Sequence, residues 1–176
     1  LAGKPVIVYT ISAFENCEAV DEIILVTSQA NLQRAWNLAR EYQWRKLTKI
    51  VPGGARRQDS VAAGLQALGA CDWVMIHDGS RPLVTNEQIL DCLHAAHEYG
   101  AAILAVPTRD AVKMVNAERM VRGTPDRSSL WLTQTPQCFR KDLIVRGYKD
   151  AFGDVSDDAV LIERQNHPVK VCMGTY

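Results

Sequence analysis

Short apolar segments alternate along the chain with segments of helical periodicity. Four apolar segments, rich in β-branched residues, have the length of strands: 22–28, 48–51, 73–77 and 101–107. A fifth lies near the C-terminus, at 169–173. Strands that are apolar on both sides are typical of a central sheet covered by helices on both faces. The pattern therefore predicts a sheet with two covered faces.

Helical patterns fill the intervals between these strands. Apolar residues recur at helical spacing in 31–44, 59–69 and 85–100, and the last segment opens with a Thr-x-x-Gln capping-box pattern and closes on Gly100. Strands and helices that alternate in this way form right-handed units with parallel strands. We therefore expect an α/β fold of three layers with a mainly parallel sheet.

The rhythm changes after Pro107. From about 107 to 135 the chain has no helical period, carries many charges and contains a Gly-Thr-Pro turn, so we expect a protruding β-arm. Helical patterns return at 140–152 and 156–166. Since no repeat, linker or low-complexity tract divides the chain, residues 1–176 are expected to form a single domain.

Composition and charge narrow the classes of partner. Of the 176 residues, 47% are hydrophobic and 23% are charged, which suits one globular domain with a buried core. The 20 Lys and Arg residues balance the 20 Asp and Glu residues, so the net charge indicates no nucleic-acid partner. No apolar run approaches the roughly 20 residues of a membrane span. With nucleic-acid and membrane partners disfavoured, we expect the partner to be a small molecule.

The cysteine and histidine residues favour neither disulfides nor a metal centre. The five cysteines are scattered and odd in number, which indicates a reducing compartment. His94 and His97 lie one helical turn apart, but without a third ligand we interpret them as exposed helical residues. The motifs of serine hydrolases, Walker ATPases and zinc proteases are absent, which disfavours those chemistries.

Ligands of doubly wound sheets bind beyond the carboxyl ends of the strands, and the first polar loop at such an end is 52–61. There Gly53 and Gly54 allow a close backbone approach, and Arg56 and Arg57 supply positive charge next to the free amides of a helix. An anionic or nucleotide ligand would suit this loop. The alternative is an ordinary strand-turn-helix connection with a polar cap.

The second such loop lies in Met-Ile-His-Asp-Gly-Ser-Arg-Pro-Leu-Val, residues 75–84. Asp78 follows a strand directly and can project as a Mg²⁺ ligand. Arg81, three residues later, could bind a phosphate through two hydrogen bonds. The alternative is that Asp78 and Arg81 pair with each other or cap the next helix.

The third polar group lies in the expected arm. Its donors could hold a second anion, although isolated charges on an arm are usually only solvated. The residues concerned are Lys113, Arg122, Arg127, Thr133 and Thr135.

Five motifs, in this order, resemble those of the 2-C-methyl-D-erythritol 4-phosphate cytidylyltransferases: GGARRQDSVAAGL, HDGSRPLV, PTRDAVK, LWLTQTPQCF and SDDAVLIE. The resemblance spans nearly the whole chain and implies a Rossmann-like nucleotidyltransferase fold. It implies transfer of a cytidylyl group from CTP to 2-C-methyl-D-erythritol 4-phosphate with release of pyrophosphate. It also implies a requirement for Mg²⁺, a homodimer, and a place in a bacterial cytoplasm or a plastid stroma.

The resemblance also implies a role for each matching residue. Asp78 would hold the metal near the ribose and the phosphates. Ser60 and the backbone of Gly53 and Gly54 would border the cytosine. Arg57 would shape the nucleotide side of the pocket, while Arg81 would shape the side of the acceptor substrate.

The family's arm is exchanged between the two subunits of a homodimer. Arg127 and Thr135 would therefore help to place the acceptor, with Arg127 acting in the partner's site. By this resemblance Arg127, Asp78 and Arg81 are the expected catalytic residues.

The chain also departs from the family pattern. A Gly-rich nucleotide loop with an arginine and a Pro-Lys pair should precede Leu1, and an Asn-Ile-Lys segment should follow Tyr176. We expect a trimmed copy of a longer enzyme, and a chain without these cations to be a poor catalyst, since each loss costs a factor of about 10² to 10³. Ala111 replaces a threonine that contacts the acceptor, which leaves open another polyol phosphate, such as ribitol 5-phosphate. A non-catalytic dimeric homologue also stays open.

Overall fold

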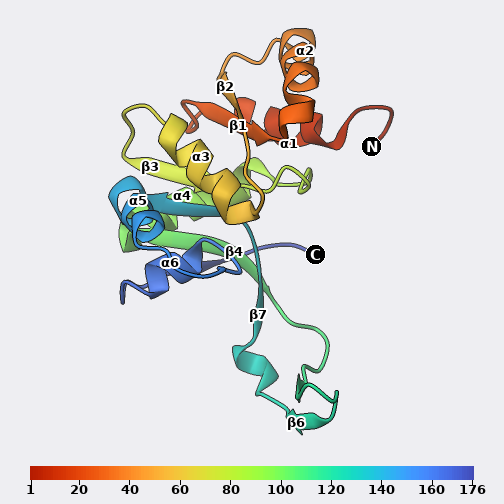
Figure 1. The fold of residues 1–176 in the computed structure, drawn as a ribbon, viewed down its shortest axis with the longest axis vertical. Helices are drawn as coiled ribbons and strands as arrows, with labels where there is room; N and C mark the ends of the chain where they lie inside the picture. The colour runs from red at the N-terminus through yellow and green to blue at the C-terminus, as the bar shows by residue number, and fades with distance from the viewer.

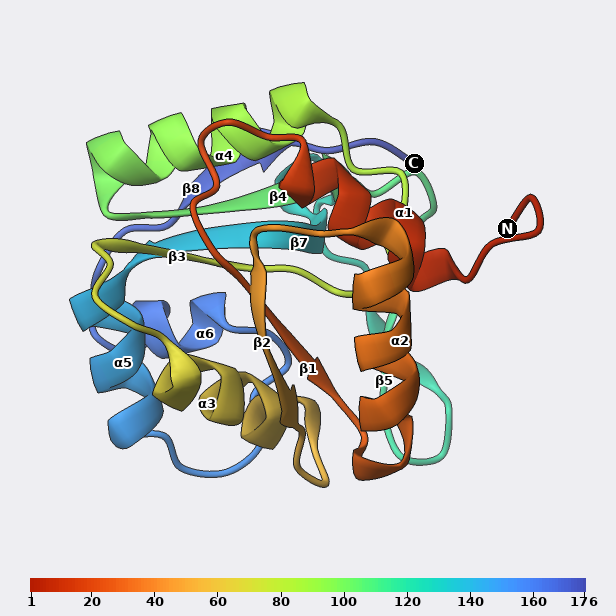
Figure 2. The ribbon, with the colours of Figure 1, turned by 90° about the horizontal axis from the view of Figure 1, so that it is seen from above.

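Strands form the middle layer of the molecule and helices cover both sides of it (Figures 1 and 2). The computed structural model describes residues 1–176. The strands are β1 (Ile23–Thr27), β2 (Leu47–Pro52), β3 (Trp73–Ile76), β4 (Ala101–Pro107), β5 (Met114–Val115), β6 (Val121–Gly123), β7 (Trp131–Arg140) and β8 (Lys170–Met173). The α-helices are α1 (Val6–Glu15), α2 (Leu32–Tyr42), α3 (Arg57–Ala67), α4 (Asn86–Tyr99), α5 (Lys141–Lys149) and α6 (Ala159–Glu163). Two short 3₁₀ helices complete the structure, η1 (Gln29–Asn31) and η2 (Arg127–Ser129).

The α/β fold expected from the sequence is confirmed. The five predicted strands correspond to β1, β2, β3, β4 and β8, and each end lies within one residue of its expected place. The capping box of α4 is also present: Gln88 N–H donates to Thr85 Oγ1 (3.2 Å) and Thr85 N–H donates to Gln88 Oε1 (3.1 Å). Gly100 ends the helix in the left-handed conformation, with φ of 84°.

The expectation of one mainly parallel sheet needs two corrections: β7 is antiparallel to its neighbours, and β1 and β2 form a separate two-stranded sheet. The larger sheet has the order β3-β7-β4-β8, in which β8 is parallel to β4, whereas β7 is antiparallel to both β3 and β4. Only residues up to Pro107 and from Trp131 belong to this sheet, so the segment predicted as an arm divides into a projecting part and a strand. Thr135, Pro136 and Gln137 interrupt the apolar run of β7, which hid a central strand from the sequence pattern.

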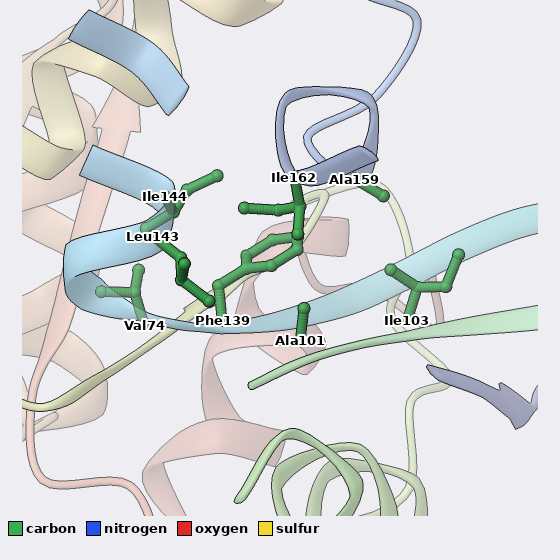
Figure 3. Close-up of a cluster of buried hydrophobic side chains, with 8 residues drawn as sticks. All are labelled: Val74, Ala101, Ile103, Phe139, Leu143, Ile144, Ala159 and Ile162. Carbon is green, nitrogen blue, oxygen red and sulfur yellow. The ribbon is translucent and has the colours of Figure 1, made fainter. Parts of the chain in front are cut away.

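Alternate residues of the central strands face two different helical layers. Phe139 of β7 lies with Leu143, Ile144 and Ile162 from α5 and α6 (Figure 3). Its neighbour Cys138 faces the opposite way and packs against buried residues of α4. Because successive strand residues point to opposite faces, this single strand anchors helices on both sides. The two core clusters that flank the larger sheet therefore meet at β7.

The residues between β4 and β7 project from the body of the molecule as an arm (Figure 1). Strands β5 and β6 form a short antiparallel ribbon within it. Several large apolar side chains of this arm are exposed, namely Met114, Val115, Met120 and Val121.

The strands β1 and β2 pair with each other and with no strand of the larger sheet. A cavity of about 1330 Å³ lies between β1 and β3 and is lined mostly by apolar residues from these strands and from α1 and α3. The edges of β1 and β3 that face this cavity therefore have no hydrogen-bonded neighbouring strand. None of the helices combines the length and the apolar character that crossing a membrane requires.

Candidate nucleotide site

The loops that follow β2 and β3 bring one acid and two arginines together. Arg57 opens α3 directly after the first loop, and its Nε donates to Asp78 Oδ1 (3.3 Å). Arg81 Nε donates to the other oxygen, Asp78 Oδ2 (3.1 Å). We call Asp78, Arg57 and Arg81 the Asp78 cluster. The two loops that the sequence analysis treated separately are thus one site.

The alternative in which Asp78 and Arg81 pair with each other is partly correct, because that ion pair is present. Asp78 does not pair with Arg81 alone, however, since Arg57 contacts the same carboxylate from another loop. The side chains of Asp78 and Arg81 are 31% and 41% exposed, so the cluster is open to solvent. A guanidinium has five N–H donors, and the one contact of Arg81 with Asp78 leaves donors for the oxygens of an anion.

A chain of hydrogen bonds fixes the loop that carries Asp78. The carbonyl of Arg81 can only accept, so His77 Nε2 donates to it (3.0 Å) and His77 Nδ1 is left to accept from the hydroxyl of Thr135 (3.1 Å). Thr135 Oγ1 in turn accepts from the backbone N–H of Asp78 (3.0 Å). Thr135, predicted to contact the acceptor, is therefore brought to the Asp78 cluster, and it also supports the backbone there.

His77 is expected to make the fold less stable in mild acid. Burial, the largest effect, lowers the pKa of His77 below its ordinary value, although the Arg81 carbonyl and the Asp78 charge act in the opposite direction. The unfolded chain then binds a proton near pH 6.5 while the folded chain does not, so stability is lost as the pH falls below about 6.5.

For one titrating group, the free energy of unfolding cannot change by more than about 1.4 kcal/mol per pH unit. Urea unfolding of the wild type and of His77→Gln at pH 7.5, 6.5 and 5.5 measures this change. We expect the wild type to lose more stability on acidification than the variant. Equal pH dependence in the two proteins would contradict the prediction.

A buried acid that the sequence analysis did not assign lies behind Arg57. Asp158 has no exposed surface; its Oδ2 accepts from Arg57 Nη2 (2.7 Å) and its Oδ1 accepts from the hydroxyl of Tyr148. Burial and the adjacent carboxylate raise the pKa of Tyr148. Burial also works against the charge of Arg57, but the ion pairs with Asp158 and Asp78 outweigh it and raise the pKa of Arg57. The only signal for Asp158 in the sequence is its place in the SDDAVLIE motif, which did not indicate a role for it.

The two glycines of the first loop are needed for its contact with α3. A Cβ on Gly54 would lie 2.3 Å from Asp59 Cβ, and a Cβ on Gly53 would lie 2.6 Å from Ser60 Oγ. Gly54 N–H donates to Ser60 Oγ (3.2 Å), which fastens the loop to the helix. The close backbone approach expected for a ligand is thus already made by the helix. A role of Ser60 and these glycines beside the cytosine stays a prediction.

Arg127 is not brought to the Asp78 cluster of its own chain. It lies in η2 within the arm, and its Nη1 donates to the carbonyl of Arg109 (3.1 Å). The nearby Lys113 Nζ donates to Thr124 Oγ1 (2.7 Å) inside the same arm. The arm projects away from the body (Figure 1), and the hydrogen bonds of these donors stay within it.

The donor set of the site does not make a metal cage. No group of three or more His, Cys, Asp or Glu side chains is placed to hold a metal ion. Asp78 offers one partly exposed carboxylate. Mg²⁺ is commonly bound through one or two carboxylates together with substrate phosphates. The residues therefore fit a Mg²⁺ ion that a nucleotide also ligates.

Known proteins resemble this chain in sequence and in fold. The family model described as "IspD: 2-C-methyl-D-erythritol 4-phosphate cytidylyltransferase" matches residues 1–176. A protein of that name from Dehalococcoides mccartyi is 44% identical over 176 residues, covering 100% of this chain and 78% of the relative. One from Caldanaerobacter subterraneus is 42% identical over 181 residues, covering 100% of this chain and 80% of the relative.

A solved structure is also similar along the full chain. The 4-diphosphocytidyl-2C-methyl-D-erythritol synthase of Anaerococcus prevotii superimposes with a TM-score of 0.92 at 31% identity, covering 100% of this chain and 79% of that one. The cytidylyltransferase from Thermus thermophilus superimposes with a TM-score of 0.78 at 27% identity, covering 98% of this chain and 80% of that one.

Proposed function

The chain belongs to the 2-C-methyl-D-erythritol 4-phosphate cytidylyltransferase family, and we propose that the Asp78 cluster is where it carries out the reaction of that family. This reaction transfers a cytidylyl group from CTP to 2-C-methyl-D-erythritol 4-phosphate. An oxygen of the acceptor phosphate forms a bond to the α-phosphorus of CTP, and the bond from that phosphorus to pyrophosphate breaks. The products are 4-diphosphocytidyl-2-C-methyl-D-erythritol and pyrophosphate.

The observation that carries the assignment to this site is the convergence of Arg57 and Arg81 on Asp78. Transfer of a cytidylyl group from CTP to a phosphate needs positive charge and fixed N–H donors more than it needs a nucleophilic side chain. Arg57, on the first turn of α3, would face the nucleotide, and Arg81, on the loop after β3, would face the acceptor. The site thus supplies donors from two separate loops to two anions.

We propose Mg²⁺ as the cofactor and Asp78 as its protein ligand. The single carboxylate and its partial exposure support this, because a nucleotide would provide the other ligands. When bound, the ion would neutralise charge on the phosphates. Arg57 and Arg81, which occupy the two oxygens of Asp78 in this structure, would then be free to donate to phosphate oxygens.

We also propose a homodimer joined through the arm. The exposed apolar residues Met114, Val115, Met120 and Val121 support this proposal, since a projecting ribbon with an apolar surface gains stability when a partner covers it. In such a dimer Arg127 would enter the partner's site and hold the acceptor phosphate. Five free cysteines and bacterial relatives support a place in a bacterial cytoplasm.

The choice of acceptor can be tested directly. Pyrophosphate release with CTP should be much faster with 2-C-methyl-D-erythritol 4-phosphate than with ribitol 5-phosphate, by a factor of about 10² or more in kcat/KM, if the site is shaped for the former. The measurement uses the protein expressed from its complete reading frame. Equal or greater turnover of ribitol 5-phosphate would contradict the proposed acceptor, and turnover of neither would favour a non-catalytic homologue.

A further inference from the structure

The buried acid of the SDDAVLIE motif has no part in the chemistry described so far. We propose that Asp158 is a positioning residue, which holds the guanidinium of Arg57 at the nucleotide side of the Asp78 cluster. The inference rests on the proposed function, because it gives Asp158 a role only if Arg57 binds the nucleotide.

The side-chain contacts of Asp158 connect it to the site through Arg57. Its carboxylate is fully buried and does not reach solvent or the open side of the cluster. One oxygen accepts from Arg57 Nη2 (2.7 Å) and the other from the hydroxyl of Tyr148. Any influence of Asp158 on a bound nucleotide must therefore pass through Arg57.

The two ends of the Arg57 guanidinium are held by acids of different character. Its Nη2 is tied to the buried Asp158, while its Nε is 3.3 Å from the partly exposed Asp78. The side chain of Arg57 is 39% exposed, so it is accessible to a ligand. The buried end acts as the fixed anchor, and the exposed contact is the one that a ligand can replace.

Anchoring matters because a free arginine side chain has many rotamers. Ordering a long side chain costs free energy when a ligand must do it, and a side chain already held in place removes that cost from binding. Tyr148 contributes by occupying the second oxygen of Asp158, which fixes the carboxylate plane. The expected consequence is a weaker nucleotide complex when the anchor is lost, with little change in the chemical step.

A purely structural role for the ion pair is the competing interpretation. A buried ion pair is weak evidence of stabilisation, and removal of its charge could simply lower the stability of the fold. The two interpretations differ in kinetics. Loss of stability lowers the amount of active protein, and so the apparent kcat, whereas loss of positioning raises KM for CTP.

Asp158→Asn tests the proposal in the protein expressed from its complete reading frame. The amide keeps the size of the side chain and removes the charge. We expect KM for CTP to rise about 10-fold or more, as for loss of a charge-assisted contact, while kcat changes less than about threefold. The matched control is Asp154→Asn, which removes an exposed carboxylate from the neighbouring Arg56 and should leave both constants within about twofold of wild type.

A double-mutant cycle with Arg57→Ala shows whether Asp158 acts through Arg57. In the Arg57→Ala background, Asp158→Asn should change KM for CTP by less than about twofold, because its target is gone. Independent, multiplying effects would overturn the proposal. So would an unchanged KM for CTP in Asp158→Asn.

A second variant keeps the proposal testable if Asp158→Asn does not fold. Tyr148→Phe retains the buried charge and removes only the hydroxyl that orients it, and we expect KM for CTP to rise about threefold. No rise would overturn the positioning role. A wild-type protein that turns over no CTP would contradict the proposed function and this inference together, whereas an active wild type with KM unchanged in both variants would contradict this inference alone.

Discussion

Asp78→Ala is expected to lower kcat/KM for CTP by about 10³-fold, the largest effect of any single change in the site. The substitution removes the only carboxylate in the cluster that is exposed enough to meet a nucleotide-bound cation. It also removes the carboxylate that orients the guanidinium of Arg81, whereas Arg57 keeps its anchor at Asp158. Steady-state pyrophosphate release at several Mg²⁺ concentrations measures the effect and should show that the residual activity no longer responds to Mg²⁺.

Asp72→Asn is the matched control for this change. Asp72 is exposed and lies at the other end of the same strand, directly before β3, away from the Asp78 cluster. Its substitution should leave kcat/KM within about twofold of wild type, as for an ordinary surface position. The oligomeric state of the Asp78→Ala protein in solution should be the same as that of the wild type. Activity within tenfold of wild type in Asp78→Ala would contradict the role of this carboxylate.

Arg127→Ala is expected to inactivate the enzyme almost as completely, but in a way that another subunit can repair. If the arm delivers Arg127 to the partner's site, a mixture of Arg127→Ala and Asp78→Ala subunits forms hybrid dimers that contain one intact site and one doubly altered site. Half of randomly assembled dimers are hybrids and half of their sites are intact, so about a quarter of wild-type activity should return. Each variant alone should stay inactive.

The measurement is pyrophosphate release after the two subunits are coexpressed and the dimers purified. A mixture that is no more active than its components would show that Arg127 does not act in a site containing Asp78 of another subunit. Arg119→Ala, on the exposed turn between β5 and β6, is the matched control and should be fully active without mixing.

Local patterns along the sequence were sufficient to predict most helices and strands. The β1, β3 and β4 segments are mostly apolar, and Thr85 and Gln88 form the capping box of α4 that the sequence predicts. Strand β7 was not recognised as central, because polar residues and a proline interrupt it and its two faces are buried by different helices, α4 on one side and α5 and α6 on the other. Periodicity reports which residues are apolar, and it does not report that a mixed segment is covered on both faces.

The candidate site was predicted only in part, again because sequence patterns are local. Asp78 and Arg81 are three residues apart and could be judged together from the sequence. The partner of Arg57, by contrast, is Asp158, which is 101 residues further along the chain. The hydrogen bond between Thr135 and the Asp78 amide spans 57 residues. Contacts of this kind depend on how β3, β7 and α6 meet in space, and no local spacing encodes them.

The ion pair between Arg57 and Asp78 joins two parts of the molecule that share no strand pairing. Arg57 follows β2 of the two-stranded sheet, and Asp78 follows β3 of the larger sheet. A nucleotide that binds both residues would act as a clamp across the seam between the sheets. Nucleotide binding would then stabilise the contact between the two sheets, and with it the folded domain.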